Sequence, residues 1–600
     1  MEFRATLLQA SGDDVLRWFA SGAQEVSAHR TYLNQINVFP VADGDTGSNL
    51  SATLRAMAEK PTPNRSFAGM LQSISRSGLE NARGNSGVIF AAYVDGLARE
   101  SGPYERVGAG EFAGIAQRAV RHLYRAVEQP REGTLMSVIR DWAESLQRNA
   151  ERFSGFPELF AAAYAAAHES LEKTKEQLAV LRRYRVVDSG AAGFVRFLEG
   201  INRVFSEDHT TASIPDAPAP EILPDLETTL YRYCTEASVE LRTPDPSPEA
   251  IAALRARLSP LGDSVILTPY GSRLKLHLHT DHPDRVMEIL EAEGQILEQK
   301  ADDLQLQTAL RARPRGGIGL LTDSIADLPD AFLREHHISV LPMGVLVRGT
   351  AYLDKVTLSL RRLFTEMDRP DDYPTSSQPE PARIQALLRE RLEAFDSLIV
   401  LSVAEPLSGT YRALVQAAAA LETPEHRITV INTRQNSGAQ GLLVRHAALL
   451  LKEGRTHDQI VSAVETRLAR THIYVCLNTL VYAVRGGRVP NTVGKLGMLV
   501  GLRPIMTLDA RGHGAAFGAA FSQKGLTRRI LRLVKRAMRR TGIEAYAIVH
   551  GANPALAETY REHLVRLTRQ EPAFITEISS AVALHAGPGT VAVCLIEKER

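Results

Sequence analysis

The stretch NVFPVADGDTGSN (37–49) is the densest polar cluster in the chain. Asp43 and Asp45 lie two positions apart with Gly44 between them, on a turn indicated by Pro40 and the glycines. Such a turn can direct both carboxylates at one ion. Hard oxygen ligands of this kind suit Mg²⁺, which takes its remaining ligands from water and substrate phosphates.

The residues that follow this turn, 46–48, predict a phosphate-binding site. An expected helix starts there, and helix starts offer free backbone N–H groups to anions. Hydroxyls and accessible amides come from Thr46, Gly47 and Ser48. The alternative is that an aspartate only caps the helix. A calcium-binding EF-hand loop fits poorly, because Ser48 and Leu54 stand where that loop needs Gly and Glu.

Three further Gly/Ser loops precede expected helices: ARGNSG (82–87), EGTLMSVIRDW (132–142) and VVDSGAAGF (186–194). Several such loops feeding helix starts are what a nucleotide site in a helical domain requires, although each alone could be a cap. The chain has neither a Walker-A pattern nor the glycine-rich loop set of protein kinases, which excludes those two classes.

Together these four motifs resemble the nucleotide-binding domain of the dihydroxyacetone kinase family, in the version found in bacterial fatty acid kinases. The resemblance covers nearly all of residues 1–204 and implies an all-α helical barrel that binds ATP and two Mg²⁺ ions. It implies that Asp43 and Asp45 hold metal and that Asn37 replaces a third acidic ligand of the ketone kinases. Arg83 is a candidate charge stabiliser, with a structural arginine as the alternative. The resemblance places the phosphates and nucleotide against Thr46, Gly47, Ser48, Asn49, Ser86 and Gly87.

Bulk composition predicts an ordinary soluble, cytoplasmic protein. At 600 residues, three or four domains are expected, and a net charge of +1 gives no general attraction to nucleic acid. The cysteines Cys234, Cys476 and Cys594 are far apart, so no disulfide framework is expected. The N-terminal stretch MEFRATLLQASGDDVLRWF predicts an amphipathic helix rather than a signal peptide, and no apolar run approaches the length of a membrane span.

Pattern changes along the chain predict a multidomain protein. Residues 1–204 have helical periodicity, and the proline-rich stretch 205–225 is interpreted as a linker. Residues 226–312 combine short strands with a helix, which predicts a small α+β middle domain. After a basic joint at RARPRGG (311–317), strands alternate with helices over 316–600. This alternation predicts an α/β domain with a parallel sheet and ligand sites at the carboxyl ends of its strands. IGLLTDS, ISVLPMGVLV, SLIVLSV and ITVINT are its expected strands.

The middle domain contains a candidate zinc site. In RLKLHLHTDHP, His277 and His279 are two apart on an expected strand and share one face. Cys234 lies in another strand, YRYCTEASVEL, that could pair alongside. Two imidazoles and a thiolate suit zinc, although alternating histidines on a half-exposed strand are often free of ligand. The segment also resembles the middle domain of fatty acid kinases, which implies that these three residues bind Zn²⁺. Water, Glu236, Asp281 or His282 could be the fourth ligand.

The back half resembles the DegV fatty-acid-binding family over roughly 316–600, and the resemblance implies a two-lobed α/β domain. The motifs that carry it are TDSIADLP (322–329), PTSSQP (374–379), PLSGTY (406–411), INTRQNSGAQG (431–441), VRGGRV (484–489) and HGANP (550–554). In that family hydroxyls, with Arg and His nearby, hold a lipid carboxylate. The matching positions are Ser376, Ser408, Arg488 and His550, with turn-capping serine as the alternative for the two serines.

The segment GLTRRILRLVKRAMRRTG (525–542) predicts a basic amphipathic helix. Seven basic residues lie between Arg528 and Arg540. Such a run is usually a solvated helix face, and peripheral contact with anionic lipid headgroups is the alternative.

These expectations combine into a fatty acid kinase in a single fused chain, which phosphorylates a bound long-chain fatty acid to an acyl phosphate. A small-ketone kinase is disfavoured because no partner domain with a covalent histidine is evident. A fatty-acid carrier or sensor with an inactive kinase domain is the remaining alternative, which the intact DGDTGSN argues against. The kinase resemblance implies a homodimer. Separate acyl-carrier or acyltransferase proteins stay open as further partners.

Overall fold

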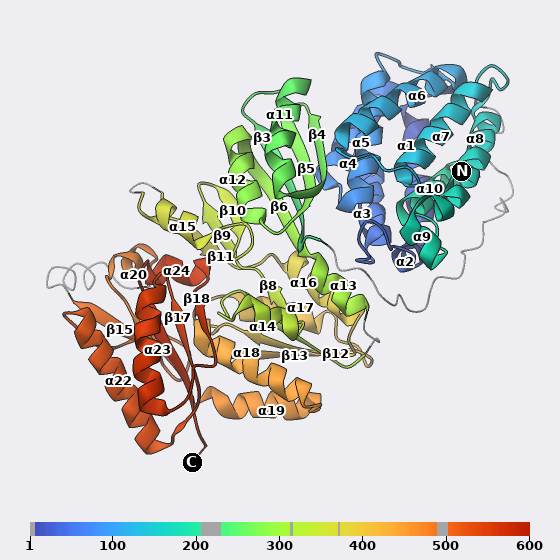
Figure 1. The fold of residues 1–600 in the computed structure, drawn as a ribbon. Helices are drawn as coiled ribbons and strands as arrows, with labels where there is room; N and C mark the ends of the chain where they lie inside the picture. Colours follow the sequence, from blue (N-terminus) through green and yellow to red (C-terminus); the bar gives the residue numbers. More distant parts are fainter. Residues whose placement is uncertain (1–6, 206–229, 313–315, 370–371, 489–501, 600) are drawn as a thin grey trace. The chain divides into compact units, whose positions relative to one another are not determined.

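The computed structural model describes residues 7–205, 230–312, 316–369, 372–488 and 502–599. Contacts divide the chain into two units, Met1–Ala312 and Arg313–Arg600 (Figure 1). The expected linker 205–225 falls almost wholly outside the described residues. Within those ranges, none of the helices combines the length and the apolar content needed to cross a bilayer.

The front of the first unit is helical. Its elements are β1 (Gln9–Ala10), α1 (Gly12–Ala28), α2 (Arg30–Gln35), α3 (Thr46–Glu59), α4 (Phe67–Asn81), α5 (Gly84–Glu100), β2 (Val107–Gly108), α6 (Ala109–Ala126), α7 (Leu135–Asn149), α8 (Phe156–Gln177), α9 (Ala179–Tyr184) and α10 (Ser189–Arg203). The first helix begins later than the sequence predicted. Gln9 and Ala10 pair with β2 instead, and Ser11 and Asp14 form a capping box at the start of α1.

Aromatic side chains fill the interior of this helical domain. The ring centroid of Trp18 on α1 lies 5.1 Å from that of Phe160 on α8. Phe112 on α6 lies 5.5 Å from the same Phe160 ring, again edge to face. Edge-on aromatic pairs contribute about 0.5–1.5 kcal/mol beyond the area they bury. The helices therefore share a solid core, and the polar groups of interest lie at helix ends.

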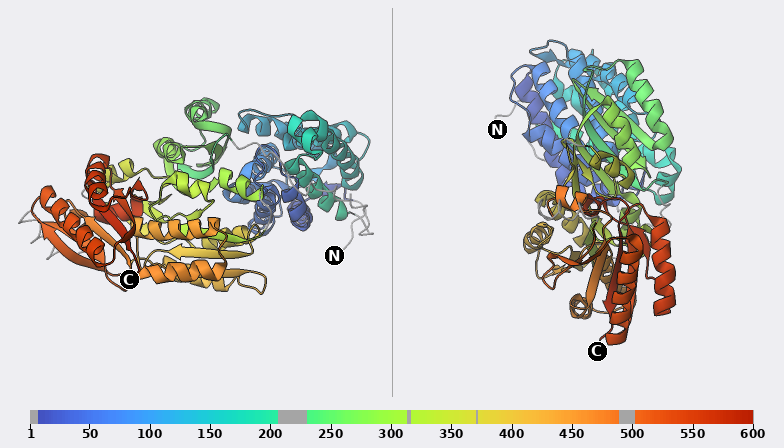
Figure 2. Two further views of the ribbon diagram at one scale, coloured as in Figure 1. Left: turned by 60° about the horizontal axis from the view of Figure 1, so that its bottom comes forward. Right: turned by 90° about the vertical axis from the view of Figure 1, so that its left-hand side faces the viewer.

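The middle domain follows as a sheet with helices on one face. Its elements are β3 (Tyr233–Leu241), α11 (Pro248–Leu258), the 3₁₀ turn η1 (Ser259–Leu261), β4 (Gly262–Tyr270), β5 (Arg273–Thr280), α12 (Pro283–Glu293), β6 (Gly294–Asp303) and α13 (Leu304–Arg311). The strands are antiparallel in the order β4-β5-β3-β6. Helices α11 and α12 pack on this sheet, and β4 and β5 also contact α5 (green beside blue in Figure 2). Residues 230–312 thus combine an antiparallel sheet with helices inside the first of the two units.

The second unit is built on two larger sheets and a small one. Its elements up to the middle are β7 (Ile318–Asp323), α14 (Asp330–Glu335), β8 (Ser339–Leu341), β9 (Gly344–Val347), β10 (Thr350–Leu353), α15 (Leu360–Met367), β11 (Thr375–Ser377), α16 (Pro381–Leu392), β12 (Ser397–Ser402), α17 (Thr410–Ala419), β13 (Arg427–Asn432) and α18 (Ser437–Lys452). The remaining elements are α19 (His457–Leu468), β14 (Thr471–Cys476), α20 (Val481–Arg485), β15 (Arg503–Leu508), β16 (Gly514–Ala520), α22 (Gln523–Arg540), β17 (Ile543–His550), α23 (Pro554–Thr568), β18 (Ile575–Glu577), α24 (Ser580–Ala586) and β19 (Val591–Glu597).

The predicted parallel sheet is present in the order β13-β12-β7-β8. One expected strand was wrong: ISVLPMGVLV divides into β8 and β9, and β9 belongs to the small sheet β10-β9-β11. Pro342 explains the break, because proline has no N–H for a sheet ladder. The third sheet has the order β16-β15-β14-β19-β17-β18. Helix α18 contacts strands of both larger sheets and so joins the two lobes of this unit.

Candidate functional site

The four polar motifs of the helical domain come together at one end of the bundle. A Cβ added to Gly190, at the start of α10, would lie 2.6 Å from Ser86 Oγ and 3.4 Å from Leu135 Cβ. A Cβ added to Gly84 would lie 2.5 Å from Asn49 Nδ2. The starts of α3, α5, α7 and α10 are therefore neighbours. The positive ends of these helix dipoles make this region favourable for the phosphates of a nucleotide.

Asp188 holds two of these helix starts in place. Its Oδ1 accepts hydrogen bonds from the backbone N–H of Leu135 (3.0 Å) and of Ala191 (2.8 Å). The first is at the beginning of α7 and the second at the beginning of α10. Burial raises the pKa of this carboxyl to about 6. The aspartate of VVDSGAAGF is thus a cap shared by two helices.

The expected metal loop places Asn37, Asp43 and Asp45 next to one another. Asn37 is buried, and its Nδ2 donates to Asp43 Oδ1 at 2.5 Å. Its own Oδ1 is buried without a hydrogen-bond partner among the described residues. Burial and the neighbouring Asp43 carboxylate raise the pKa of Asp45 well above its usual value. A divalent cation would offset this repulsion, so the donor set fits Mg²⁺.

The simpler capping interpretation of this loop does not account for Asp45. It precedes α3 as the N-cap residue, yet its side chain makes no capping hydrogen bond. Asn34, which none of the sequence motifs had singled out, has that kind of role instead. Its Nδ2 donates to Ser48 Oγ at 2.9 Å, and its Oδ1 accepts from the Ser48 N–H at 3.0 Å. Gly47 allows close packing, because an added Cβ would lie 2.3 Å from Arg30 O.

The second glycine loop lies against Thr53. The backbone N–H of Arg83 donates to Thr53 Oγ1 at 3.2 Å, and the Arg83 residue is exposed. A Cβ on Gly87 would lie 2.5 Å from the same Thr53 hydroxyl oxygen. Gly87 is therefore needed for packing, whereas Arg83 has a side chain open to solvent. Its expected charge-stabilising role stays a prediction, as do the nucleotide contacts of Thr46, Ser86 and Asn49.

One face of the middle-domain sheet carries polar side chains in matched rows. Cys234 on β3 is paired with His279 on β5 and Asp302 on β6. Glu236 is paired with His277 on β5 and Lys300 on β6. Lys300 also forms an ion pair with Asp302. The strand period of two therefore brings a thiol, two imidazoles, two carboxylates and an ammonium group onto one surface.

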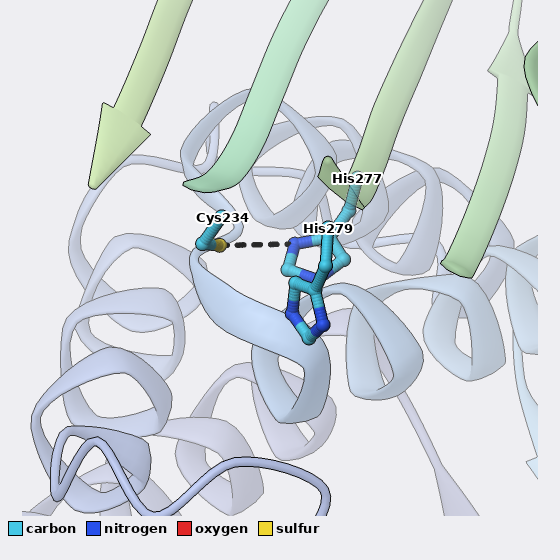
Figure 3. Close-up of side chains that lie close together, drawn as sticks. All are labelled: Cys234, His277 and His279. Atoms are coloured by element: carbon cyan, nitrogen blue, oxygen red, sulfur yellow. Dashed lines mark hydrogen bonds between the residues drawn. The ribbon is translucent and has the colours of Figure 1, made fainter. Parts of the chain in front are cut away.

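Cys234, His277 and His279 form a compact group in this surface (Figure 3). One potential ligand atom from each lies within 4.8 Å of the others, and all three residues are buried. Cys234 Sγ is 3.9 Å from His277 Nδ1. His277 Nε2 is buried and has no hydrogen-bond partner in the described part of the chain. Burial, together with the Glu236 charge, raises the pKa of the Cys234 thiol. An unsatisfied imidazole nitrogen and a buried thiol fit a zinc ion.

The surroundings distinguish among the expected fourth ligands. Glu236 Oε1 lies 3.2 Å from His277 Nδ1 and is buried. Asp281 is exposed and accepts from the Arg232 N–H, and His282 is exposed at the start of α12. Asp263 Oδ1, which no local sequence pattern had indicated, lies 3.2 Å from His279 Nδ1. Glu236 and Asp263 thus approach the two imidazoles at equal distance, Glu236 from a buried position, and Asp263 can orient His279.

The two expected sites of the first unit adjoin each other. The N–H of Gly84, at the start of α5, donates to Glu236 Oε1 at 2.6 Å. Val41 of the metal loop, Cys234 and Leu304 form one buried apolar cluster. The sequence alone gives two separate sites, because the Gly84–Glu236 contact spans 152 positions. The middle domain therefore forms one wall of the region around the metal loop.

In the second unit, two of the four expected lipid-binding residues, Ser408 and Arg488, are neighbours, and the strand that carries Ser376 ends beside them. Ser408 Oγ lies 2.8 Å from Thr410 Oγ1, and Arg488 Nη2 donates to Leu407 O at 3.0 Å. Ser376 is exposed on β11, two residues before Gln378. A Cβ on Gly409 would lie 2.1 Å from Gln378 Oε1, so the end of β11 borders the Ser408 turn.

An apolar cluster lies beside these polar groups. Thr410 Oγ1 donates to Met343 Sδ at 3.4 Å, and Met343 packs with Ile325, Val403 and Ala581. Hydroxyl and guanidinium donors next to buried apolar side chains suit a ligand with a carboxylate head and an apolar chain.

His550 is not brought to this group by any hydrogen bond among the described residues. It ends β17, and its Nδ1 accepts from the Asn553 N–H at 3.4 Å. The expected role of His550 stays a prediction. His585 is a second imidazole to consider: its Nδ1 is buried without a partner in the described ranges, and a Cβ on Gly486 would lie 2.2 Å from that atom. Burial and the Arg488 charge lower the pKa of His585 to about 4. The turn LHAGPG (584–589) before the last strand was the overlooked signal.

Three family models match successive parts of the chain. Residues 40–203 match the DAK2 domain. Residues 230–311 match the FakA-like middle domain of fatty acid kinases. Residues 317–598 match the DegV family, whose model is described as an uncharacterised protein family.

Each relative and each solved structure described below matches only part of the chain. An uncharacterized protein of Staphylococcus epidermidis is 30% identical over 297 residues, which are 48% of this chain and 54% of that protein. One of Staphylococcus saprophyticus has the same identity and coverage. The chain thus spans about half the length of these curated relatives.

Among solved structures, a fatty acid binding DegV family protein of Streptococcus agalactiae is 24% identical, with a TM-score of 0.43. The match includes 99% of the Streptococcus agalactiae protein and 47% of this chain. A DegV family protein of Thermus thermophilus, also described by its fatty acid binding, is 29% identical with a TM-score of 0.42 at the same coverage. One polypeptide therefore matches the models of a DAK2 domain, a FakA-like middle domain and a DegV-family domain, in that order along the chain.

Proposed function

We propose that the protein is a fatty acid kinase that transfers the γ-phosphoryl group of ATP to the carboxylate of a bound fatty acid. The observation that carries the proposal is the meeting of the starts of α3, α5, α7 and α10 beside the carboxylates of Asp43 and Asp45. Helix starts favour phosphate, and paired carboxylates favour a hard cation. The matches to the DAK2 and FakA-like middle domains support a kinase.

The reaction places modest demands on the protein. A fatty acid carboxylate is ionised at neutral pH, so its oxygen can attack the γ-phosphorus without a general base, while the bond to the ADP oxygen breaks and ADP leaves. The difficulty is repulsion between anions. Asp43 and Asp45, with Asn37 beside them, would hold Mg²⁺, which when bound neutralises phosphate charge. The helix starts orient the phosphates, and exposed Arg83 can add positive charge.

The acyl substrate is assigned to the second unit. Ser376, Ser408 and Arg488 would hold the carboxylate, with His550 or His585 as the nearby imidazole. The match of residues 317–598 to the DegV family, some of whose solved members are described as fatty acid binding, favours this ligand class. Each buried methylene contributes about 0.8 kcal/mol, so a long chain can offset the loss of carboxylate hydration.

A zinc ion is assigned to Cys234, His277 and His279, with buried Glu236 as the candidate fourth ligand. Its proposed role is structural. It would join β3 to β5 on the face from which Glu236 contacts Gly84. The ion would also satisfy the buried His277 Nε2 and allow the Cys234 thiol to ionise.

The test is acyl phosphate formation by the full chain. Purified protein is incubated with ATP, Mg²⁺, palmitate and hydroxylamine, and the hydroxamate is measured. We expect wild-type turnover and a loss of at least about 100-fold in Asp43→Ala, because the pair would lose half of its metal-binding charge. Arg334→Ala, an exposed change on α14, is the control. Palmitate binding without any hydroxamate would instead support the carrier alternative.

A further inference from the structure

Arg311, the last residue of α13, reaches back to the metal loop across 269 to 277 positions. Its Nη1 donates to Asn37 O at 3.0 Å and to Ala42 O at 2.8 Å. Its Nη2 donates to Asn34 O at 2.9 Å. The guanidinium group therefore binds backbone carbonyls on both sides of the turn that precedes Asp43.

Gly44 shows how closely this side chain follows the loop. Gly44 separates Asp43 from Asp45 and has a φ of +72°, a conformation that favours glycine. A Cβ added there would lie 2.4 Å from Arg311 Nε and 2.5 Å from its Cζ. The arginine thus packs directly against the backbone between the two aspartates, so a change in its position has to change the loop.

Arginine is suited to this place for two reasons. Its planar guanidinium group has five donors in a fixed fork, so one side chain can serve several carbonyls, whereas a lysine ammonium cannot match that geometry. Asn34 also lies in the last turn of α2, which has no basic residue of its own there. A cation at a helix carboxyl end satisfies carbonyls that the helix leaves unpaired.

We infer that Arg311 is a positioning residue for metal binding. It fixes the loop that carries Asp43 and Asp45, and it makes the geometry of that loop depend on the last helix of the middle domain. This inference rests on the proposed function, because it assumes that these aspartates hold the cation. Arg311 would act through the backbone carbonyls of Asn34, Asn37 and Ala42.

The experiment compares Arg311→Ala and Arg311→Lys in the full chain, with Arg285→Ala as the control. Arg285 is an exposed arginine on α12 of the same domain. Mn²⁺ binding is titrated by the electron paramagnetic resonance signal of the free ion, and hydroxamate formation is measured against Mg²⁺ concentration. Loss of a group that orients metal ligands typically weakens metal binding about 10- to 100-fold. For Arg311→Ala we therefore expect the midpoint Mn²⁺ concentration for binding and the midpoint Mg²⁺ concentration for hydroxamate formation both to rise by that factor. Arg311→Lys should fall between, with Arg285→Ala unchanged.

Amide hydrogen exchange separates this role from general destabilisation. In both Arg311 variants the amides of residues 37–45 should exchange faster, while those of the α5–α7 core keep wild-type rates. Gly44→Ala supplies an independent probe: it should raise the Mn²⁺ midpoint in wild type and have a smaller effect in Arg311→Ala, where the clash is relieved.

Unchanged midpoints and unchanged loop exchange in both Arg311 variants would overturn the inference. If the wild-type chain binds Mn²⁺ and the Arg311 variants bind it more weakly as expected, but the wild-type chain forms no hydroxamate, the proposed function alone is overturned. A wild-type chain that binds no Mn²⁺ would overturn both.

Discussion

A single carboxylate oxygen can determine how two parts of a binding site are placed, and Asp188 illustrates this at the residue scale. Its Oδ1 serves the N–H groups that begin α7 and α10, which come from motifs more than fifty positions apart in the sequence. Both motifs could be predicted as candidate nucleotide loops from the sequence. That an aspartate of one motif caps the helix of the other could not be predicted, because that contact depends on helix packing.

Replacing Asp188 should separate its hydrogen bonds from its charge. Asp188→Ala leaves two buried N–H groups without an acceptor, and each unsatisfied group costs about 1–3 kcal/mol. Asp188→Asn keeps an oxygen acceptor and should remain near wild type. Urea unfolding followed by circular dichroism measures both. An alanine variant as stable as the asparagine variant would contradict this role.

The pH dependence of the free energy of unfolding, compared between wild type and Asp188→Asn, is a separate prediction. Burial raises the pKa of Asp188 from 3.8 to about 6 in the folded state, so the folded chain binds this proton more tightly than the unfolded chain. The free energy of unfolding should therefore fall as pH rises from about 4 to about 6. Asp188→Asn lacks this contribution, so the wild-type minus Asn difference should decrease across that range. A constant difference would show that the carboxyl is not perturbed.

At the scale of the element, the alternation of side chains along a strand was predicted best from the sequence, and contacts between distant elements were predicted worst. The pattern of RLKLHLHT predicted that His277 and His279 share a face of one strand, and the pairing of β5 with β3 confirms this and places Cys234 beside them. The contacts of Glu236 with Gly84 and of Arg311 with Asn37 could not be predicted. They depend on how two domains pack, and nothing in the local pattern of either segment reports on that.

Helix α22 is the element whose role stays a prediction. Leu526, Ile530 and Val534 are buried against its own unit, and no acidic residue occurs in Gln523–Arg540. Its exposed face carries Arg528, Arg532, Lys535, Arg536 and Arg539, with exposed Phe517 and Phe521 preceding it in the chain. If this face meets anionic lipid, each cation near the surface contributes about 1 kcal/mol.

Vesicle sedimentation decides between lipid contact and a solvated face for α22. The full chain should pellet with vesicles rich in phosphatidylglycerol and stay in solution with phosphatidylcholine alone. Changing Arg528, Arg532 and Arg539 to Glu should abolish pelleting, and raising the salt concentration should weaken it. Matched changes at Arg334, Lys452 and Arg455, which are exposed elsewhere in the same unit, are the control. Equal pelleting by both triple variants would leave α22 as a solvated face.

At the scale of the whole molecule, each unit has a core of its own, so ligands assigned to different units should stabilise different parts of the chain. The proposed zinc group lies in Met1–Ala312 and the proposed lipid site in Arg313–Arg600. Differential scanning calorimetry of the full chain should therefore show two transitions. A ligand at 100 times its dissociation constant stabilises the state that binds it by about 2.7 kcal/mol. Palmitate should raise only one transition temperature, and a zinc chelator should lower only the other.

Cys234→Ser should lower the same transition as the chelator and make it insensitive to zinc, because the site would keep its two imidazoles but lose its thiolate. A single transition that responds to both treatments would mean that the two assignments do not belong to separate cooperative units.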